Sequence, residues 1–285
     1  MFLFLRTRRL SVKLFKNKST AGLLSAPYMA WALIFILVPL GMVFYYGLTN
    51  DNGSFTLENI TTIAKPGYLK ALVRSLRLAV ISTLVCFILA YPLGMILSSM
   101  KLSRNTYIVT LFILPMWMNF LLRTLTWMTL LEGKGVINTI LEFFHLPTIN
   151  VINTGAAIVL GMVYNFLPFM ILPIYNSLNK IDENVINAAR DLGANTLQTF
   201  LKITLPLSLP GILSGITMVF IPALTTFAIS TMLGGSKILL IGNIIEQEFT
   251  QLYDWHLGSG LSIVLMVFII LNMIIETVFD KGGNA

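Results

Sequence analysis

The sequence has 285 residues, 56% of them hydrophobic and only 11% charged, and its mean hydropathy is +0.83. Soluble globular domains carry about 25% charged residues and rarely contain uninterrupted apolar runs of ~20 residues. This composition excludes a soluble enzyme or binding domain and predicts an integral membrane protein. The net charge of +7 does not indicate nucleic-acid binding, because no compact basic module accompanies it.

The N-terminal 26 residues form a basic leader. Six of the nineteen basic residues lie within the first eighteen positions, with no acidic residue among them. A basic flank before an apolar segment is typical of the cytoplasmic side of a membrane. The apolar segment that follows is longer than the ~7–15 residues of a cleavable signal core. We therefore expect residues 1–26 to be a cytoplasmic leader before a retained anchor, and residues 27–285 to be one transmembrane domain.

Six apolar segments are long enough to cross ~30 Å of hydrocarbon as helices that rise 1.5 Å per residue. With the leader inside, both termini are expected in the cytoplasm. The single cysteine, Cys86, lies within an apolar run and predicts neither a disulfide nor a metal site. The predicted all-α fold has spans at Pro27–Leu48, Leu76–Met100, Tyr107–Leu131, Gly155–Leu178, Gly211–Met232 and Gly258–Phe279.

Polar and aromatic side chains deep within these spans are candidates for a substrate path. Trp117 lies about ten residues into the third span, ~15 Å deep, which is too deep for an interfacial tryptophan. Arg123 is the one charge well inside a span, and we expect it to snorkel outward or to pair with an acid such as Glu132. The residues alone leave open whether the candidates line a cavity or pack helices together. They are Tyr91, Trp117, Asn119, Tyr164, Asn165, Thr225 and Thr226.

One long cytoplasmic loop, residues 179–210, precedes the fifth span. Its pattern predicts two short helices. The first runs from about Glu183 to Leu192 with Asp182 as its cap, and Gly193 fits the position after the helix, where φ is positive. The second runs from about Thr196 to Ile203 and stops before Pro206.

Small residues in this loop permit close approach of another backbone. Ala188, Ala189, Gly193 and Ala194 would form a knob for the groove of a partner protein. A helical connection between two spans would explain the same residues without any partner, and the physical pattern does not decide between the two.

The loop resembles the EAA motif of ABC importer permeases, in which two alanines are followed by a glycine and then by Ile-x-Leu-Pro at a fixed distance. The one departure is Asn187, which stands where the family usually has glutamate. The resemblance implies a type I (MetI-like) permease with cytoplasmic coupling helices that transmit movement from a separate ATPase. The implied contact residues are Asn187, Ala188, Ala189, Arg190, Asp191, Leu192, Gly193, Ala194, Ile203, Leu205 and Pro206.

Other stretches resemble the spermidine/putrescine permeases of the PotB type. They begin at Leu114, Leu167, Ala188 and Gly234. This resemblance implies a non-catalytic subunit of the bacterial cytoplasmic membrane, working with a second permease (PotC type), an ABC ATPase dimer (PotA type) and an extracytoplasmic polyamine-binding protein (PotD type). ATP and Mg²⁺ would be bound by the ATPase, because this chain has no G-x-x-x-x-G-K-[ST] sequence and is expected to bind no cofactor.

Two alternatives stay open from the sequence. The first is an ABC permease for another cargo, such as an anion or an amino acid, since the loop motif carries no information on substrate. The second is a secondary transporter driven by an ion gradient. That class predicts acidic residues within the spans, whereas the one nearest to a span interior, Glu276, lies close to the cytoplasmic end.

Overall fold

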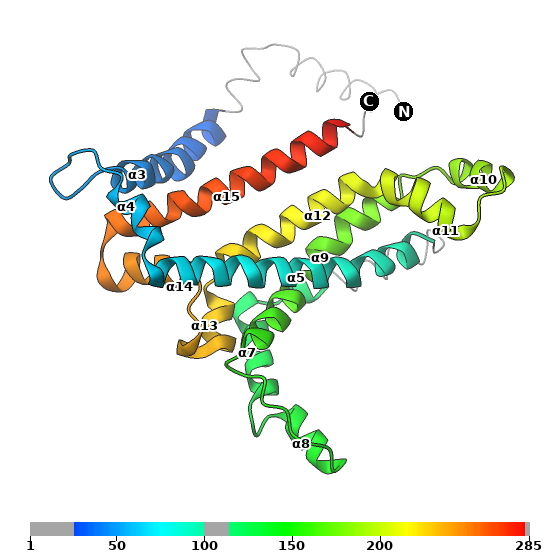
Figure 1. Cartoon of the computed structure of the whole chain (residues 1–285), viewed down its shortest axis with the longest axis horizontal. Helices are drawn as coiled ribbons and strands as arrows, with labels where there is room; N and C mark the ends of the chain where they lie inside the picture. The colour runs from blue at the N-terminus through cyan, green and yellow to red at the C-terminus, as the bar shows by residue number, and fades with distance from the viewer. Residues whose placement is uncertain (1–25, 100–113, 283–285) are drawn as a thin grey trace, which may run out of the picture.

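The computed structural model describes residues 26–99 and 114–282, and within these ranges the protein is helical (Figure 1). The only β feature among the described residues is an isolated bridge between Thr49 and Phe55. Five helices are long and apolar enough to cross a membrane, and they correspond to the first, second, fourth, fifth and sixth predicted spans. They are Ala26–Gly47, Pro66–Ser99, Gly155–Leu178, Thr196–Thr225 and Trp255–Val278.

The third predicted span, Tyr107–Leu131, is only partly within the described ranges. Its described part is a 3-10 turn, η3 (Leu114–Trp117), followed by α7 (Phe120–Leu131). Asn119 begins α7, because its side chain accepts hydrogen bonds from the backbone N–H groups of Leu121 and Leu122. The count of six spans therefore stays a prediction, as does the basic leader, which lies outside the described residues.

Helix α5 (Pro66–Ser99) begins at a proline ten residues before the predicted span Leu76–Met100, and its 34 residues are more than a membrane crossing needs, so the helix extends beyond the span. One predicted span boundary was wrong. The fifth span does not reach Met232: α12 (Leu205–Thr225) ends at an extended residue, Thr226, and a separate helix α13 (Ala228–Gly234) follows.

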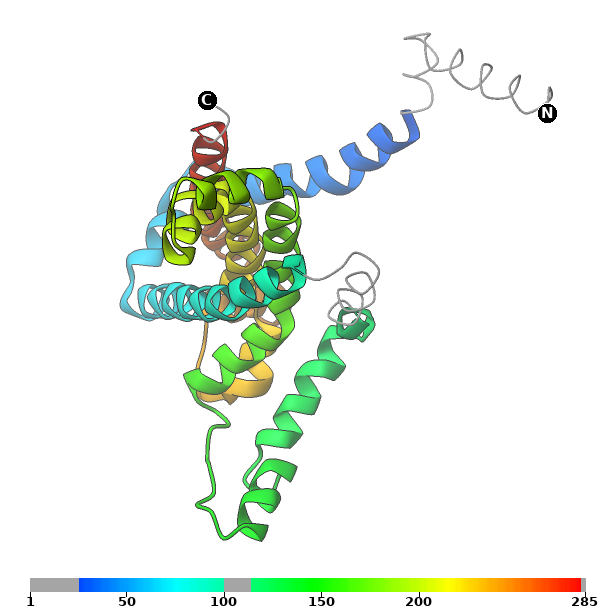
Figure 2. The same ribbon diagram turned by 90° about the vertical axis from the view of Figure 1, so that its right-hand side faces the viewer.

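The core consists of α5, α9 (Gly155–Leu178) and α12, which lie against one another in both views (Figures 1 and 2). Close packing of α12 on α9 depends on the pair Gly211-x-x-x-Gly215. A Cβ atom at Gly211 would lie 2.5 Å from the carbonyl oxygen of Pro173, and one at Gly215 would lie 2.7 Å from the sulfur of Met170. Small residues at this spacing let two membrane helices approach closely.

The other elements are arranged around this core. The first span, with its π turn η1 (Leu33–Leu37) and α3 (Val38–Gly47), packs on α15 (Trp255–Gly282). Helix α7 packs on α9 and α13, and α8 (Val136–Phe143), which follows it, extends away from the core (Figure 2). The end of the bundle opposite to α10 (Glu183–Asp191) and α11 (Thr196–Thr199) is formed by α4 (Glu58–Thr61), η2 (Thr62–Ala64), α13, η5 (Gly235–Lys237), α14 (Ile241–Gln247) and η6 (Glu248–Leu252).

Candidate functional site

The loop after α9 contains the first predicted helix, α10. It starts after Asp182, whose carboxylate accepts a hydrogen bond from the backbone N–H of Asn184 at 2.9 Å. The predicted cap is therefore confirmed, and the helix ends at Asp191, one residue before the predicted end. Glu183 in its first turn and Arg190 in its last turn both complement the helix dipole.

The turn after α10 is a Schellman motif. Gly193 has φ +85°, as the sequence predicted. Its N–H bonds to the carbonyl of Arg190 at 2.9 Å, and the N–H of Ala194 bonds to the carbonyl of Ala189 at 3.0 Å. These two bonds satisfy carbonyl groups that the end of the helix leaves free. The turn therefore holds α10 at a set angle to the following helix.

The second loop helix does not stop before Pro206, so this part of the prediction was wrong. A capping box between Asn195 and Gln198 starts α11, which passes through a π-helical turn, η4 (Phe200–Thr204), directly into α12. Proline has no N–H for the carbonyl four residues earlier and crowds it. The wider π turn accommodates Pro206, because the N–H of Leu205 bonds to the carbonyl of Phe200, five residues back. Thr196–Thr225 is thus one helix of 30 residues.

The side chains that α10 and α11 expose differ from those that the alanine pattern suggested. Ala189 is buried within the loop, whereas Ala188 is exposed. The largest apolar side chains open to contact are Leu192, which is 90% exposed, and Leu197, which is 65% exposed. Sequence reasoning included Leu192 only as a member of the motif. Leu192 lies between the end of α10 and the turn at Gly193, and this position was the signal that its side chain points outward.

The remaining motif residues lie around these leucines. Asn187, Arg190, Asp191 and Pro206 are exposed, whereas Ile203 and Leu205 are half-buried. Among the residues that the structure describes, neither Arg190 nor Asp191 lies within ion-pair distance of an opposite charge, and the one contact of that length found there is between His256 and Asp51. The loop thus presents apolar side chains surrounded by unpaired charges.

Three of the substrate-path candidates lie within helix packing. The hydroxyl of Tyr91 contacts that of Ser208 at 2.9 Å, which joins α5 to α12. Asn165 is buried and donates to the carbonyl of Gly161 at 2.9 Å. Thr225 donates to the carbonyl of Ile221 within its own helix.

The other candidates do not gather at one place. Thr226 is buried at the break after α12. Trp117 is 81% exposed and lies close to the exposed Asn119 at the start of α7. Tyr164 is partly exposed on α9, where its ring meets that of Trp127 edge to face at 5.4 Å. The candidate set therefore divides into packing residues and a smaller exposed group.

Arg123 is neither snorkelling nor paired with Glu132, contrary to the expectation from sequence. The side chain is buried, and its Nε and Nη1 atoms have no hydrogen-bond partner among the described residues. Helix α7 turns Arg123 toward the protein interior, next to the buried Thr124. The direction of the Arg123 side chain was not readable from the sequence, because a proline-containing turn, η3, interrupts the predicted span before α7 begins.

Asn243 is a buried polar residue that sequence reasoning missed. Its amide donates to the Phe227 carbonyl at 3.1 Å and to the Thr231 hydroxyl at 2.8 Å. Its oxygen accepts from the Ser230 hydroxyl at 2.6 Å and from the N–H of Leu240 at 3.1 Å. Asn243 therefore links the start of α14 to α13, the helix that follows the break after α12.

Comparison with known proteins identifies this arrangement of spans and loop. Residues 90–282 match the family model described as binding-protein-dependent transport system inner membrane component. The spermidine/putrescine transport system permease protein PotB of Haemophilus influenzae is 38% identical over 250 residues, covering 85% of this chain and 87% of the relative. PotB of Escherichia coli strain K12 is 37% identical over 255 residues, with coverage of 87% and 93%.

The chain is a binding-protein-dependent permease of the PotB family. Membership in this family confirms the resemblance found in the sequence and makes the chain a multi-pass membrane protein of an ABC importer. The family model covers the loop that contains α10 and α11.

Solved structures support the fold. A chain of the bacterial alginate ABC transporter, solved with an alginate pentasaccharide-bound periplasmic protein, has a TM-score of 0.74 at 17% identity and covers 93% of this chain. A chain of the MetNI methionine ABC transporter in an inward-facing form has a TM-score of 0.56 at 20% identity, covering 75% of this chain and 95% of that one. At these identities the likeness shows the permease fold alone.

Proposed function

We propose that this chain is the permease subunit of an ATP-driven polyamine importer and that it forms the translocation path with a second permease. Relatives named for spermidine and putrescine transport, 37–38% identical over most of the chain, support this cargo. The observation that carries the mechanism is the loop itself. It exposes Leu192 and Leu197 and is joined to a span by an uninterrupted helix.

The exposed leucines suit a docking element for an ATPase. Apolar side chains gathered on a polar surface mark protein contacts, and an amphipathic helix commonly lays its apolar face in a partner's groove. We infer that Leu192 of α10 enters such a groove and that Arg190 and Asp191 pair at its rim. ATP and Mg²⁺ belong on that ATPase in this scheme, and the permease itself is non-catalytic and binds no cofactor.

Because α11 is continuous with α12, movement of the loop would be transmitted to the membrane-spanning part of the helix. A helix of 30 residues spans ~45 Å and moves as one body when its loop end is pulled. Two polar contacts couple α12 to α15: the Ser214 hydroxyl donates to Glu276 and the Thr217 hydroxyl donates to the Asn272 side-chain oxygen, both at 2.9 Å. Closure of the ATPase dimer would therefore move both helices and act on the break at Thr226.

The orientation follows from the docking assignment. An ATPase that hydrolyses cellular ATP lies in the cytoplasm, so α10 and α11 face the cytoplasm. With six spans, both termini lie on that side as well, in the bacterial cytoplasmic membrane. We expect the other subunits to be a PotC-type permease, a PotA-type ATPase dimer and a PotD-type binding protein at the opposite face.

The exposed substrate-path candidates, Trp117, Asn119 and Tyr164, fit a polycation better than the candidates that are packed between helices. An amine can lie over the face of Trp117, a contact worth about 0.5–2 kcal/mol, with the Asn119 region beside it. Contacts of this size bind too weakly to hold a polyamine in the path, which suits passage. Strong selection would then belong to the extracytoplasmic binding protein.

Uptake of labelled spermidine tests the cargo. A strain that lacks the chromosomal copy should regain uptake when this chain is expressed with its partner subunits, and unlabelled putrescine should compete. Competition by an anion or an amino acid at equal concentration, with none by putrescine, would overturn the polyamine assignment. It would leave an ABC permease for another cargo.

A further inference from the structure

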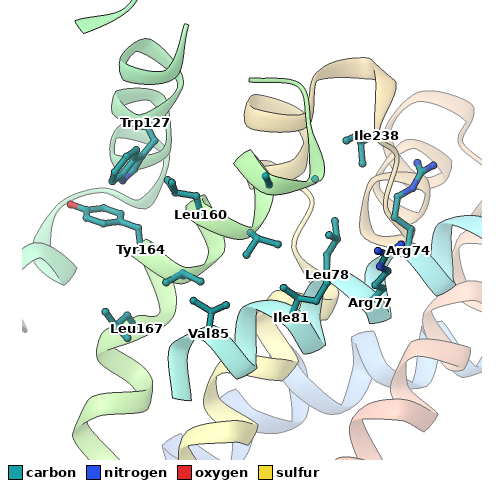
Figure 3. Close-up of a pocket in the computed structure, with 14 residues that line it drawn as sticks. Arg74, Arg77, Leu78, Ile81, Val85, Trp127, Leu160, Tyr164, Leu167 and Ile238 are labelled. Carbon is teal, nitrogen blue, oxygen red and sulfur yellow. The ribbon is translucent and has the colours of Figure 1, made fainter. Parts of the chain in front are cut away.

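A groove of about 890 Å³ runs between α5 and α9. Its walls are two stripes of apolar side chains at helical spacing, one on each helix, which include Leu78, Ile81 and Val85 of α5. Figure 3 shows Arg74 and Arg77 at one end of the groove and Trp127 and Tyr164 at the other, with aliphatic side chains between them.

The charged end of this groove belongs to a larger basic cluster. Lys70, Arg74 and Arg77 follow one face of α5 at spacings of four and three residues, and Arg77 is exposed while Arg74 is half-buried. Lys70, Arg74 and Lys237 line an adjoining pocket of about 400 Å³. Within residues 26–99 and 114–282, none of the four cations has an ionic partner.

The length of α5 places the cluster at the level of lipid headgroups. Its 34 residues extend ~51 Å, whereas the hydrocarbon core is ~30 Å thick. Arg77 is 22 residues before Ser99, or ~33 Å along the helix. When the Ser99 end lies at one hydrocarbon boundary, Arg77 lies close to the other. After Arg77 in the chain, toward Ser99, the same face of α5 becomes apolar.

This side of the membrane ordinarily carries few basic residues. Figure 1 places the start of α5 at the end of the bundle opposite to α10 and α11. In the orientation proposed above, it is the extracytoplasmic side, where the positive-inside rule disfavours lysine and arginine. A cluster of four cations would also repel a polycation cargo. Its charge is complementary to an anion that is held against an apolar surface.

We propose that this groove binds an anionic phospholipid of the outer leaflet. The guanidinium groups of Arg74 and Arg77 would hold the phosphate, for which planar arginine forks are well suited, while Lys70 and Lys237 add positive charge. An acyl chain would lie along the aliphatic walls and end at the Trp127–Tyr164 pair. Basic pockets between membrane helices bind acidic lipid headgroups in this way. The assignment of the lipid to the outer leaflet rests on the proposed orientation, whereas the proposal that the groove binds an anionic lipid does not.

Trp127 makes the proposal testable by fluorescence. The assembled transporter is placed in phosphatidylcholine nanodiscs with increasing amounts of phosphatidylglycerol or phosphatidylcholine that carry bromine on the acyl chain. We expect the brominated phosphatidylglycerol to quench at about a tenfold lower mole fraction than brominated phosphatidylcholine. Trp127→Phe should remove this component, which assigns the quenching to the groove.

The double variant Arg74→Gln/Arg77→Gln should bring the two lipids within twofold of each other. Lys65→Gln/Lys134→Gln removes two other lysines and should keep the preference, because neither lines the groove or its adjoining pocket. Equal quenching of the unmodified protein by both lipids would overturn the proposal. Absence of Trp127 quenching by either lipid in the assembled transporter would also overturn it, since a protein helix would then fill the groove. The assay needs no transport and stands apart from the polyamine assignment.

Discussion

Replacement of Leu192 by serine tests the docking role of the loop most directly. The side chain is 90% exposed in the permease, so Leu192→Ser should change the stability of the permease itself by less than about 0.5 kcal/mol. Burial of a leucine in a partner contributes about 1.5–3 kcal/mol. Loss of ~2 kcal/mol corresponds to roughly 30-fold weaker binding of the ATPase.

Binding of the purified ATPase to the permease in nanodiscs measures this change, together with uptake of labelled substrate. Leu57→Ser is the matched control, because Leu57 is also an exposed leucine but precedes α4 at the opposite end of the bundle. The control should bind the ATPase normally. If Leu192→Ser bound the ATPase within twofold of the unmodified chain, Leu192 would not be an anchor and the docking surface would have to lie elsewhere.

Three further predictions concern Gly193 in the loop turn, the buried amide of Asn243 and the buried carboxyl group of Glu248. At Gly193, where φ is +85° and a side chain would meet no neighbouring atom, valine should impair coupled uptake through backbone strain of ~1–2 kcal/mol, while asparagine should be tolerated. Asn243→Leu should lower the melting temperature in detergent, because the buried N–H of Leu240 loses its acceptor and the hydroxyls of Ser230 and Thr231 each lose one partner, at a cost of about 1–3 kcal/mol. Burial, aided by the carboxylate of Asp254, raises the pKa of Glu248 above 4.5. The folded chain therefore holds this proton more tightly, and stability should fall as the pH rises above about 4.5; Glu248→Gln should flatten that slope in pH-dependent melting.

Much of the loop between α9 and α12 could be predicted from local chemistry. The cap at Asp182 and the positive φ at Gly193 depend on a few neighbouring atoms, and both were confirmed. The prediction that the second loop helix stops before Pro206 was wrong, and the reason lies in the packing of the helix. Proline usually ends a helix, but one π turn makes room for Pro206, and the choice between these outcomes depends on how α12 packs against α9.

Depth along a span did not predict which polar residues are exposed. Tyr91 and Trp117 were equivalent candidates in the sequence, yet Tyr91 is packed against Ser208 and Trp117 is open. The direction in which a side chain points around its helix depends on neighbouring helices, and a span that is apolar on all sides carries little periodicity to reveal it.

The sequence alone was enough to predict the class of protein, the approximate positions of five apolar helices and the cap and glycine turn of the loop before α12. These features follow from hydrocarbon thickness, helix rise and the conformational needs of glycine and capping residues, all of which act locally. Three features are evident only from the packed fold: the loop helix continues into α12, Arg123 is buried, and the apolar stripes of α5 and α9 meet beside Arg74 and Arg77. Those facts depend on contacts between segments far apart in the chain, where the packing of small residues sets the distance and rotation of each helix.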